Sequence, residues 1–458
     1  MSKRNVPRNA DEAEVAAFHR QPRLGLSRRE FLAGLAATTG ALALGGCGDD
    51  NGSGVQSDLE SAPLPHPDNS GIEHVVVVMM ENRSFDHFLG WVPGADGVQE
   101  GFAFADKQGE MQSTFPLAPN PQNCQFADPD HSYEGGRAQF NGGANDGWLR
   151  ASTNDVFPIG YYTRDDLAFY GSAVPAWTTC DRYFAAILGP TFPNRFYMHA
   201  AQTDRLDNTL TISRLPTIWD RLAEKGLTGG YYYSDLPVLA LFGAHHVPIS
   251  NPIDQFFAAA AAGTLPNVSY VDPRFIGEDQ GTSNDDHPLA DIRNGQAFLS
   301  RIYDAVTRSP NWSDTVFIVN YDEWGGFFDH VTPPLAPRTD HDLMIGNDGR
   351  LGFRVPCLVV SPLARRGFVG HKRYDHTSIL SFIEWRWGLD PLSVRDATAN
   401  NIAHALDFSR PKNLLAPRFD VPQGPFGVAC TTNAMAARSE MAGLRSLAEH
   451  HKFFLPTR

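Results

Sequence analysis

Two short polar segments follow strongly apolar stretches of this sequence. Glu81 and Asn82 come directly after the apolar run 75–80, and Asp322 and Glu323 come after a second apolar run. Runs that are apolar on both faces are typical of strands buried in a parallel sheet, which carries ligand sites beyond the carboxyl ends of its strands. Carboxylate and amide oxygens are hard donors that suit a divalent cation. The four side chains are therefore predicted to bind one divalent metal ion of unknown identity.

The chemistry of four such donors at one place favours a metal over an empty site. Without a cation the carboxylates would repel one another, and at least one pKa would rise. A bound cation removes that conflict and leaves a Lewis acid in the site. Taken alone, either Glu81 with Asn82 or Asp322 with Glu323 could instead be a solvent-exposed polar turn that binds no metal.

Thr191 is the candidate nucleophile, in the segment Gly-Pro-Thr-Phe-Pro-Asn-Arg at 189–195. A threonine followed by proline and a helical pattern is also a good N-cap, and this is the structural alternative. A hydroxyl at a helix N-terminus lies beside free N–H groups that favour a phosphate. An adjacent cation would lower the pKa of the hydroxyl and make an alkoxide accessible.

Four histidines in loop-like segments are candidates for hydrogen bonding and acid catalysis. They are His131 in Asp-Pro-Asp-His-Ser, the pair His245 and His246, and His287 in Asp-Asp-His-Pro. A single loop histidine is usually a surface residue. Several histidines in one pocket could bind phosphate oxygens and protonate a leaving alkoxide. The sequence does not decide which of them is the acid.

Alternating strand and helix patterns must position these residues. Strands are expected at 75–80, 268–271, 315–320 and 356–360, and helices at 215–225, 252–262, 287–308 and 374–387. This alternation predicts an α/β fold with a mainly parallel central sheet flanked by helices. Residues 91–170 are rich in Gly, Asn and Pro, which predicts irregular structure over one end of the sheet.

Several of these segments resemble the motifs of one enzyme family. Residues 81–87 and 322–330, together with the Thr191 segment, are similar to motifs of the bacterial phosphoesterase family that contains phospholipases C and acid phosphatases. The resemblance implies an alkaline-phosphatase-like sandwich and a structural role for His376. The site residues that it implies are Thr191 and His287 as catalytic residues, and His131, His245, His246 and Asn194 as substrate-binding residues.

The family resemblance implies a phosphoric ester hydrolase acting on a phosphate ester or a phospholipid. A phospholipase C-like enzyme and a broad-specificity acid phosphatase remain alternatives. The chain lacks the C-terminal β modules of the longer phospholipases, which favours a compact phosphatase or a general phosphodiesterase. A sulfatase is excluded because no cysteine lies in a Cys-x-Pro-x-Arg setting. A non-catalytic phosphate-binding lipoprotein is the remaining alternative.

The N-terminal region predicts export. Arg28 and Arg29 precede a short apolar stretch that ends at Leu-Gly-Gly-Cys47, which resembles a twin-arginine signal with a lipobox. Residues 1–47 are therefore expected to be a signal peptide that engages the twin-arginine machinery, 48–70 a flexible linker, and 71–458 the catalytic domain. Lipidation of Cys47 would anchor an exported, periplasmic or surface protein to the membrane; the alternative is an ordinary cleaved signal.

The net charge limits the possible binding partners, and the cysteine content limits the possible disulfide bonds. The formal net charge of −14 argues against nucleic acid as a partner. The cysteines beyond Cys47 are Cys124, Cys180, Cys357 and Cys430, and none forms a Cys-x-x-Cys pair. Four cysteines in an oxidising compartment allow three pairings, and the sequence does not choose among them.

Overall fold

The strand β1 (His74–Met80) lies inside a large mixed sheet. In residues 62–430 and 437–456, which the computed structural model describes, eight strands form this sheet in the order β13-β6-β12-β11-β1-β10-β8-β9. The other seven strands are β6 (Thr178–Cys180), β8 (Gly229–Tyr233), β9 (Ser250–Pro252), β10 (Val268–Asp272), β11 (Thr315–Tyr321), β12 (Cys357–Val360) and β13 (Phe368–Gly370). β12 runs antiparallel to both neighbours, and the other pairs are parallel. The predicted mainly parallel sheet is confirmed.

The position of β1 follows from its sequence. Val75 to Val78 of this strand are at most 1% exposed, so neither face of the strand meets solvent. β1 pairs in parallel with β10 on one side and β11 on the other, with Met80 opposite Tyr321. The residues that follow β1 and β11 therefore leave the sheet side by side.

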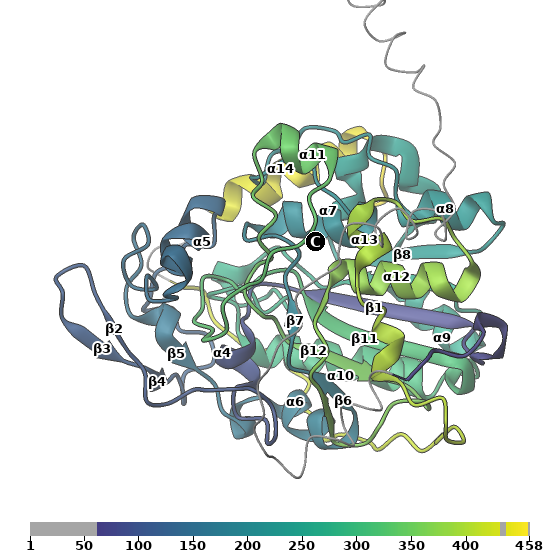
Figure 1. The fold of residues 1–458 in the computed structure, drawn as a ribbon, viewed down its shortest axis with the longest axis horizontal. Helices are drawn as coiled ribbons and strands as arrows, with labels where there is room; N and C mark the ends of the chain where they lie inside the picture. The colour runs from purple at the N-terminus through teal and green to yellow at the C-terminus, as the bar shows by residue number, and fades with distance from the viewer. Residues whose placement is uncertain (1–61, 431–436, 457–458) are drawn as a thin grey trace, which may run out of the picture. The chain divides into compact units, whose positions relative to one another are not determined.

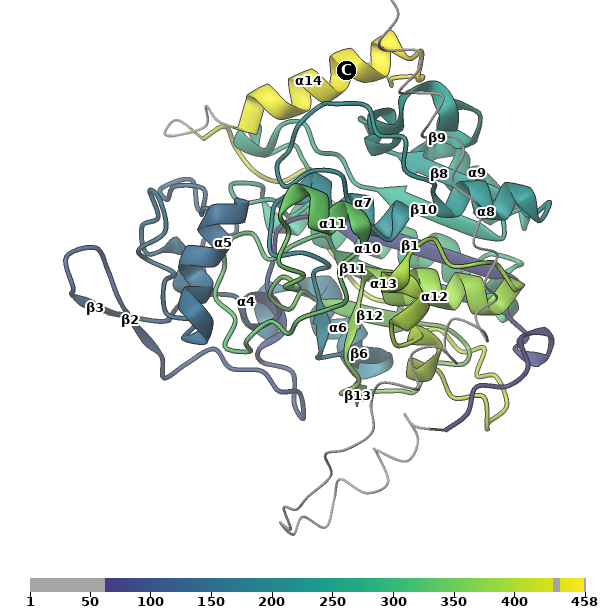
Figure 2. The ribbon, with the colours of Figure 1, turned by 45° about the horizontal axis from the view of Figure 1, so that its top comes forward.

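Helices cover both faces of the sheet (Figures 1 and 2). Consecutive side chains of a strand point to opposite faces. In β8, Tyr231 packs against His199 of α7, and Tyr232 packs against Phe256 of α9. α7 contacts α8 and α12, whereas α9 contacts α10, which contacts α6. The bounds are α6 (Ala168–Ala173), α7 (Thr191–Ala200), α8 (Ile218–Glu224), α9 (Ile253–Ala262), α10 (Ile292–Thr307) and α12 (His376–Trp387).

One predicted helix begins later than expected. The helix predicted at 287–308 starts at Ile292, because Asp291 caps it by accepting a hydrogen bond from the N–H of Arg293 over 3.0 Å. Leu289 has φ of 75°, which a right-handed helix cannot contain. His287 therefore lies in a loop before α10.

Residues 91–170 contain short elements, as predicted. They include the hairpin of β2 (Ala103–Ala105) and β3 (Met111–Ser113), the short strands β4 (Phe115–Pro116) and β5 (Gly160–Tyr161), and the helix α5 (Tyr133–Phe140). Figure 1 shows this part of the chain beside one end of the sheet. The helix α4 (Phe85–Leu89) lies between β1 and these elements along the chain.

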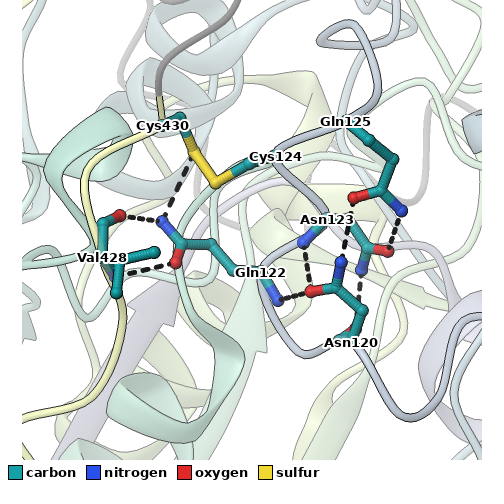
Figure 3. The surroundings of a disulfide bond; sticks show 7 residues. All are labelled: Asn120, Gln122, Asn123, Cys124, Gln125, Val428 and Cys430. Carbon is teal, nitrogen blue, oxygen red and sulfur yellow. Dashed lines mark hydrogen bonds between the residues drawn. A yellow bond between two sulfur atoms is a disulfide. The ribbon is translucent and has the colours of Figure 1, made fainter.

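A disulfide joins this region to the C-terminal segment (Figure 3). Cys124 is bonded to Cys430, whereas Cys180 and Cys357 are buried thiols, so none of the three pairings into two disulfides is formed in full. Beside the disulfide, Gln122 donates to the carbonyl of Val428 over 2.7 Å. The helix α14 (Ala437–His450) follows this anchored segment in the chain.

The predicted signal peptide, the Arg28-Arg29 pair and Cys47 lie outside the described residues. Of the predicted linker 48–70, the described residues include 62–70. This part contains the short helix η1 (Pro67–Asn69). Within the described part of the chain, no helix is both long and apolar enough to cross a bilayer.

Candidate active site

The end of β1 places Glu81 and Asn82 against the end of β11. The backbone N–H of Asn82 donates to Oδ1 of Asp322 over 3.1 Å. Asn82 has φ of 60°, a conformation that asparagine tolerates better than most residues. Gly325 approaches this turn so closely that a Cβ there would lie 2.0 Å from the carbonyl oxygen of Asn82. Glycine at 325 therefore lets the two segments meet.

Each carboxylate of the second segment uses one oxygen locally. Oδ1 of Asp322 accepts from the N–H of Glu323 over 2.7 Å, and Oε2 of Glu323 accepts from the N–H of Gly325 over 2.6 Å. These bonds fix the side chains and leave Oδ2 of Asp322 and Oε1 of Glu323 for another partner.

The four predicted metal ligands keep unpartnered oxygens. Within the described residues, Oε2 of Glu81, Oδ1 of Asn82, Oδ2 of Asp322 and Oε1 of Glu323 are buried without a hydrogen-bond partner. A buried polar atom without a partner costs about 1–3 kcal/mol, and a cation bound to these oxygens would remove that cost. Burial and the charge of Asp322 raise the pKa of Glu81 well above its usual value. A divalent cation fits this donor set.

Arg195 of α7 partly neutralises the same acids. Its buried guanidinium lies 2.8 Å from Oε1 of Glu81, 2.9 Å from Oδ1 of Asp272 and 3.5 Å from Oδ2 of Asp322. Sequence reasoning did not assign Arg195 a role, although it stands four residues after Thr191. One guanidinium among four carboxylates, counting Glu323, leaves an excess of negative charge for a cation.

Thr191 begins α7 but does not cap it. The N-cap is Pro190, and Thr191 is the first helical residue, so the N-cap alternative is wrong. The N–H of Phe192 donates instead to Oδ1 of Asn208 over 2.8 Å. Nothing in the described part of the chain is hydrogen-bonded to the hydroxyl of Thr191, which is buried to 3% exposure. The hydroxyl is thus free to react.

Thr191 and Glu81 line one cavity of about 480 Å³. Of the described residues that line it, five are acidic, two are histidines, and none is Lys or Arg. Met441 of α14 supplies an apolar wall. The acidic residues are Glu81, Asp128, Asp130, Asp207 and Glu278, and the histidines are His131 and His287.

The two histidines lie edge to face with ring centres 5.6 Å apart. Nδ1 of His131 donates to the carbonyl of Pro129 over 2.7 Å, and its Nε2 lies 3.3 Å from Nδ2 of Asn82. Nδ1 of His287 lies 3.1 Å from Oε2 of Glu278. Burial opposes the charged form of His287, but the carboxylates of Glu278 and other acids outweigh it and raise its pKa well above the usual value.

The sequence also matches a known family over most of its length. The match to the phosphoesterase family covers residues 72–390. The chain belongs to the phosphoesterase family. The predicted family and the predicted phosphoric ester hydrolase are therefore confirmed.

This phosphoesterase has relatives named phospholipases C. It is 31% identical to phospholipase C B of Mycobacterium tuberculosis, over 87% of this chain and 89% of that protein. It is also 31% identical to the non-specific phospholipase C1 of Arabidopsis thaliana, over 75% of this chain and 72% of that protein. A solved structure, the lipoteichoic acid synthase LtaP from Listeria monocytogenes, matches 88% of this chain and 99% of that one at a TM-score of 0.40 and 8% identity.

Three predicted substrate-binding residues of this phosphoesterase lie elsewhere. His245 is exposed and pairs with Asp220 over 2.6 Å. Nε2 of His246 lies 3.3 Å from Oγ1 of Thr217, at the start of α8. The amide of Asn194 is hydrogen-bonded to the loop before α7, where it donates to the carbonyl of Gly189 over 2.8 Å. Neither these histidines nor Asn194 lines the cavity, because local contacts hold each of them away from it.

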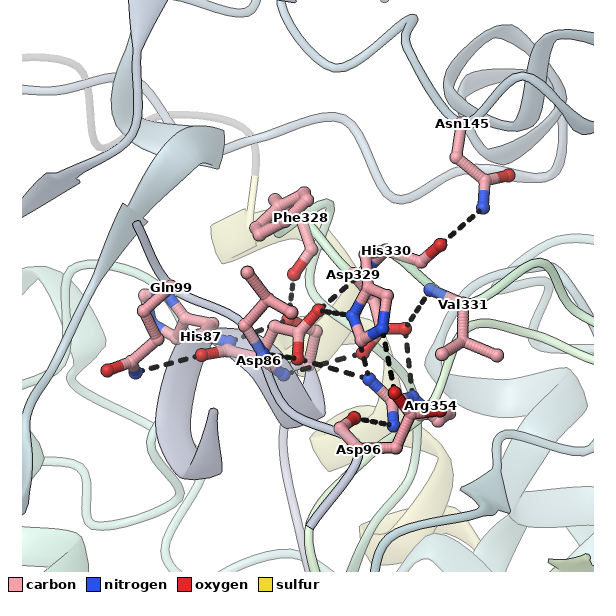
Figure 4. A network of polar contacts seen from close by, with 12 residues as sticks. Asp86, His87, Asp96, Gln99, Asn145, Phe328, Asp329, His330, Val331 and Arg354 are labelled. Carbon is pink, nitrogen blue, oxygen red and sulfur yellow. Dashed lines mark hydrogen bonds and ion pairs between the residues drawn. The ribbon is translucent and has the colours of Figure 1, made fainter. Parts of the chain in front are cut away.

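A second polar cluster joins the two motifs (Figure 4). Arg354 donates to Oδ1 of Asp86 over 3.1 Å and to Oδ1 of Asp329 over 3.0 Å. Nδ1 of His330 lies 2.6 Å from Oδ2 of Asp86. Asp86, Asp329 and His330 are close enough to ligate a metal, but Arg354 already supplies their positive charge. This cluster is an ion-pair network that holds residues 81–87 against 322–330.

Proposed function

We propose that this phosphoesterase hydrolyses phosphodiesters of the phospholipid type through a threonine nucleophile. The observation that carries the proposal is that Thr191, with its unbonded hydroxyl, shares one cavity with Glu81 of the unpartnered oxygen set. A cation bound at Glu81 would therefore face the same cavity as the attacking hydroxyl. The names of the Mycobacterium tuberculosis and Arabidopsis thaliana relatives support a phospholipase C-like reaction.

The metal would be held by Glu81, Asn82, Asp322 and Glu323, and when bound it supplies a Lewis acid beside the phosphate. The residues of the chain perform the remaining steps. Thr191 loses the proton of its hydroxyl to solvent and attacks phosphorus, and the phosphorus–oxygen bond to the alcohol breaks. His131 donates to the phosphate, and His287 protonates the departing alcohol. Water then hydrolyses the phosphothreonine.

The charge of the cavity favours a diester over a monoester. A phosphomonoester dianion is usually held by Lys or Arg, and neither lines this cavity in the described residues. Asp128, Asp207 and Glu278 would repel a second negative charge but tolerate a neutral or cationic substituent. The apolar wall at Met441 adds a surface for a lipid backbone.

The test compares purified protein with phosphatidylcholine, bis(p-nitrophenyl) phosphate and p-nitrophenyl phosphate side by side. We expect kcat/KM for the diesters to exceed that for the monoester by at least about tenfold, equal to about 1.4 kcal/mol of barrier. A preference for the monoester would identify a broad-specificity acid phosphatase instead. Phosphate binding without turnover of any ester would identify a non-catalytic phosphate-binding protein.

We also propose that the protein is exported by the twin-arginine route and anchored by lipid at Cys47. Support comes from the Arg28-Arg29 pair, the short apolar stretch after it, and the Leu-Gly-Gly-Cys sequence that ends it. An anchored enzyme would meet phospholipid at the membrane surface, which is consistent with the proposed substrate.

A further inference from the structure

Arg83 is a buried arginine two residues after Glu81, and it is only 1% exposed. Its Nε donates to the carbonyl of Asp286 over 2.6 Å, and its Nη2 donates to the carbonyl of His287 over 3.3 Å. The guanidinium lies 4.7 Å from the ring centre of Phe327. Arg83 therefore connects the first metal-ligand segment to the backbone of the His287 loop.

The pairing of Arg83 is unusual for a buried cation. Among the described residues, no carboxylate oxygen lies within 4.0 Å of its guanidinium nitrogens. Its remaining contact is Nη1 to Nε2 of His87 over 2.9 Å. Arginine only donates, so His87 accepts there and donates from Nδ1 to the carbonyl of Gly160 over 2.7 Å. A buried charge held mainly by carbonyl groups costs stability, and this cost calls for a functional explanation.

The loop that Arg83 holds is strained. Asp286 and Leu289, on either side of His287, both have φ of 75°, which non-glycine residues rarely adopt. The loop belongs to no helix or strand that would fix it. Two further anchors are Tyr321, whose hydroxyl donates to Oδ2 of Asp286 over 2.6 Å, and the backbone N–H of Glu81, which donates to the carbonyl of Asp285 over 2.8 Å. All three anchors come from the segments that carry the proposed metal ligands or directly precede them.

We propose that Arg83 is a positioning residue that fixes His287 relative to Thr191 and the metal-ligand segment. Arg83 touches neither the cavity nor the reacting atoms. Arg83 holds the carbonyl groups of Asp286 and His287, which flank the backbone nitrogen of His287. Because the backbone at His287 is fixed in this way, its imidazole has one position from which to reach the leaving group. This inference rests on the proposed function, in which His287 protonates the departing alcohol.

The experiment compares two phosphorylcholine diesters that differ in the leaving group. p-Nitrophenolate departs without protonation, whereas hexanolate needs an acid. We expect His287→Ala to lose about a hundredfold in kcat on the hexyl ester and less than about fivefold on the p-nitrophenyl ester. Arg83→Lys removes the planar fork whose Nε and Nη2 hold the two carbonyl groups, so it should show the same selectivity. The double variant should lose no more than His287→Ala alone.

The control is Arg366→Lys, because Arg366 also donates to two backbone carbonyls and stacks on Trp177, but far from the cavity. It should leave both esters unaffected. Metal content, measured by elemental analysis, should be unchanged in Arg83→Lys. If Arg83→Lys does not fold, Tyr321→Phe loosens the same loop and should give a smaller loss with the same selectivity.

Several results would overturn the proposal. One is an equal loss on both esters in Arg83→Lys. A second is a loss of bound metal in Arg83→Lys. A third is a double variant whose loss of kcat is the product of the losses of Arg83→Lys and His287→Ala. A fourth is a loss in Tyr321→Phe that is equal on both esters. These outcomes leave the proposed function intact if the wild-type enzyme hydrolyses both esters. A wild-type enzyme inactive on both, or a His287→Ala variant without leaving-group selectivity, would instead remove the assigned acid and this inference with it.

Discussion

The backbone N–H of Asn82 donates to Oδ1 of Asp322 over 3.1 Å, although the two residues are 240 positions apart. This bond joins the carboxyl ends of β1 and β11, which are neighbours in the sheet. It leaves Oδ1 of Asn82 and Oδ2 of Asp322 buried without hydrogen-bond partners in the described chain. The predicted metal site therefore depends on two adjacent strand ends.

Removing one ligand should therefore remove the metal. Asp322→Asn keeps the shape of the side chain but loses its charge, so elemental analysis should find little bound metal, and turnover should fall with it. Strong chelation of the wild type should have the same effect. Asp235→Asn, at a buried carboxylate outside the cavity, should keep its metal. An active enzyme free of metal in a strong chelator would contradict the site.

Thr191 can be tested as a nucleophile without the ambiguity of a helix cap. Thr191→Ala should lose at least about a thousandfold in turnover, on the order of 4 kcal/mol. Because Pro190 is the N-cap, the same change removes no cap and should cost only the burial of one methyl group, about 1 kcal/mol in the free energy of unfolding. Thr191→Ser should retain substantial activity, and acid quench during turnover should trap phosphate on this peptide. Near-parental turnover in Thr191→Ala would exclude this mechanism.

His376 predicts a pH dependence of stability. Its Nε2 donates to the carbonyl of Asp322 over 2.7 Å, and burial lowers its pKa from 6.5 to about 4. The unfolded chain binds this proton more readily, so the contribution is present above pH 6.5 and lost as pH falls toward 4. The loss should reach about 3 kcal/mol.

Urea unfolding of wild type and His376→Gln across this range measures the effect. The variant lacks the titrating group, so its deficit in stability should be largest near neutral pH and should narrow as the pH falls. A deficit that stays constant with pH would show that His376 does not titrate in this range.

The disulfide should stabilise the protein. Reduction, or Cys124→Ser with Cys430→Ser, should lower the free energy of unfolding by about 2–4 kcal/mol, because the unfolded chain regains freedom over a long loop. Calorimetry with and without reductant checks this. Cys357→Ala serves as the control, since it should remain sensitive to reductant while the double variant does not.

Export can be tested at the N-terminus. Arg28→Lys with Arg29→Lys should hold the protein in the cytoplasm, and Cys47→Ala should release the exported form from membranes. Fractionation with immunoblotting measures both. Normal export of the double-lysine variant would argue against the twin-arginine route.

Local sequence was enough to predict the strand ends. The four valines of β1 are apolar on both faces, and an element with such a pattern must be buried between helix layers. The polar residues that follow β1 and β11 then lie at one edge of the sheet whatever the details of the loops. For this reason the apolar pattern alone points to Glu81, Asn82, Asp322 and Glu323, and their role as ligands stays a prediction to be tested.

Tertiary structure alone decided which distant groups meet these ends. His245, His246 and Asn194 have suitable chemistry, but short-range bonds to Asp220, Thr217 and the 187–190 loop hold them away from the cavity. Conversely, Arg195 reaches Glu81 across 114 positions, and Cys124 reaches Cys430 across 306. Such pairings depend on the packing of whole elements, because side chains reach only a few ångströms and sequence pattern does not encode which elements come within that range.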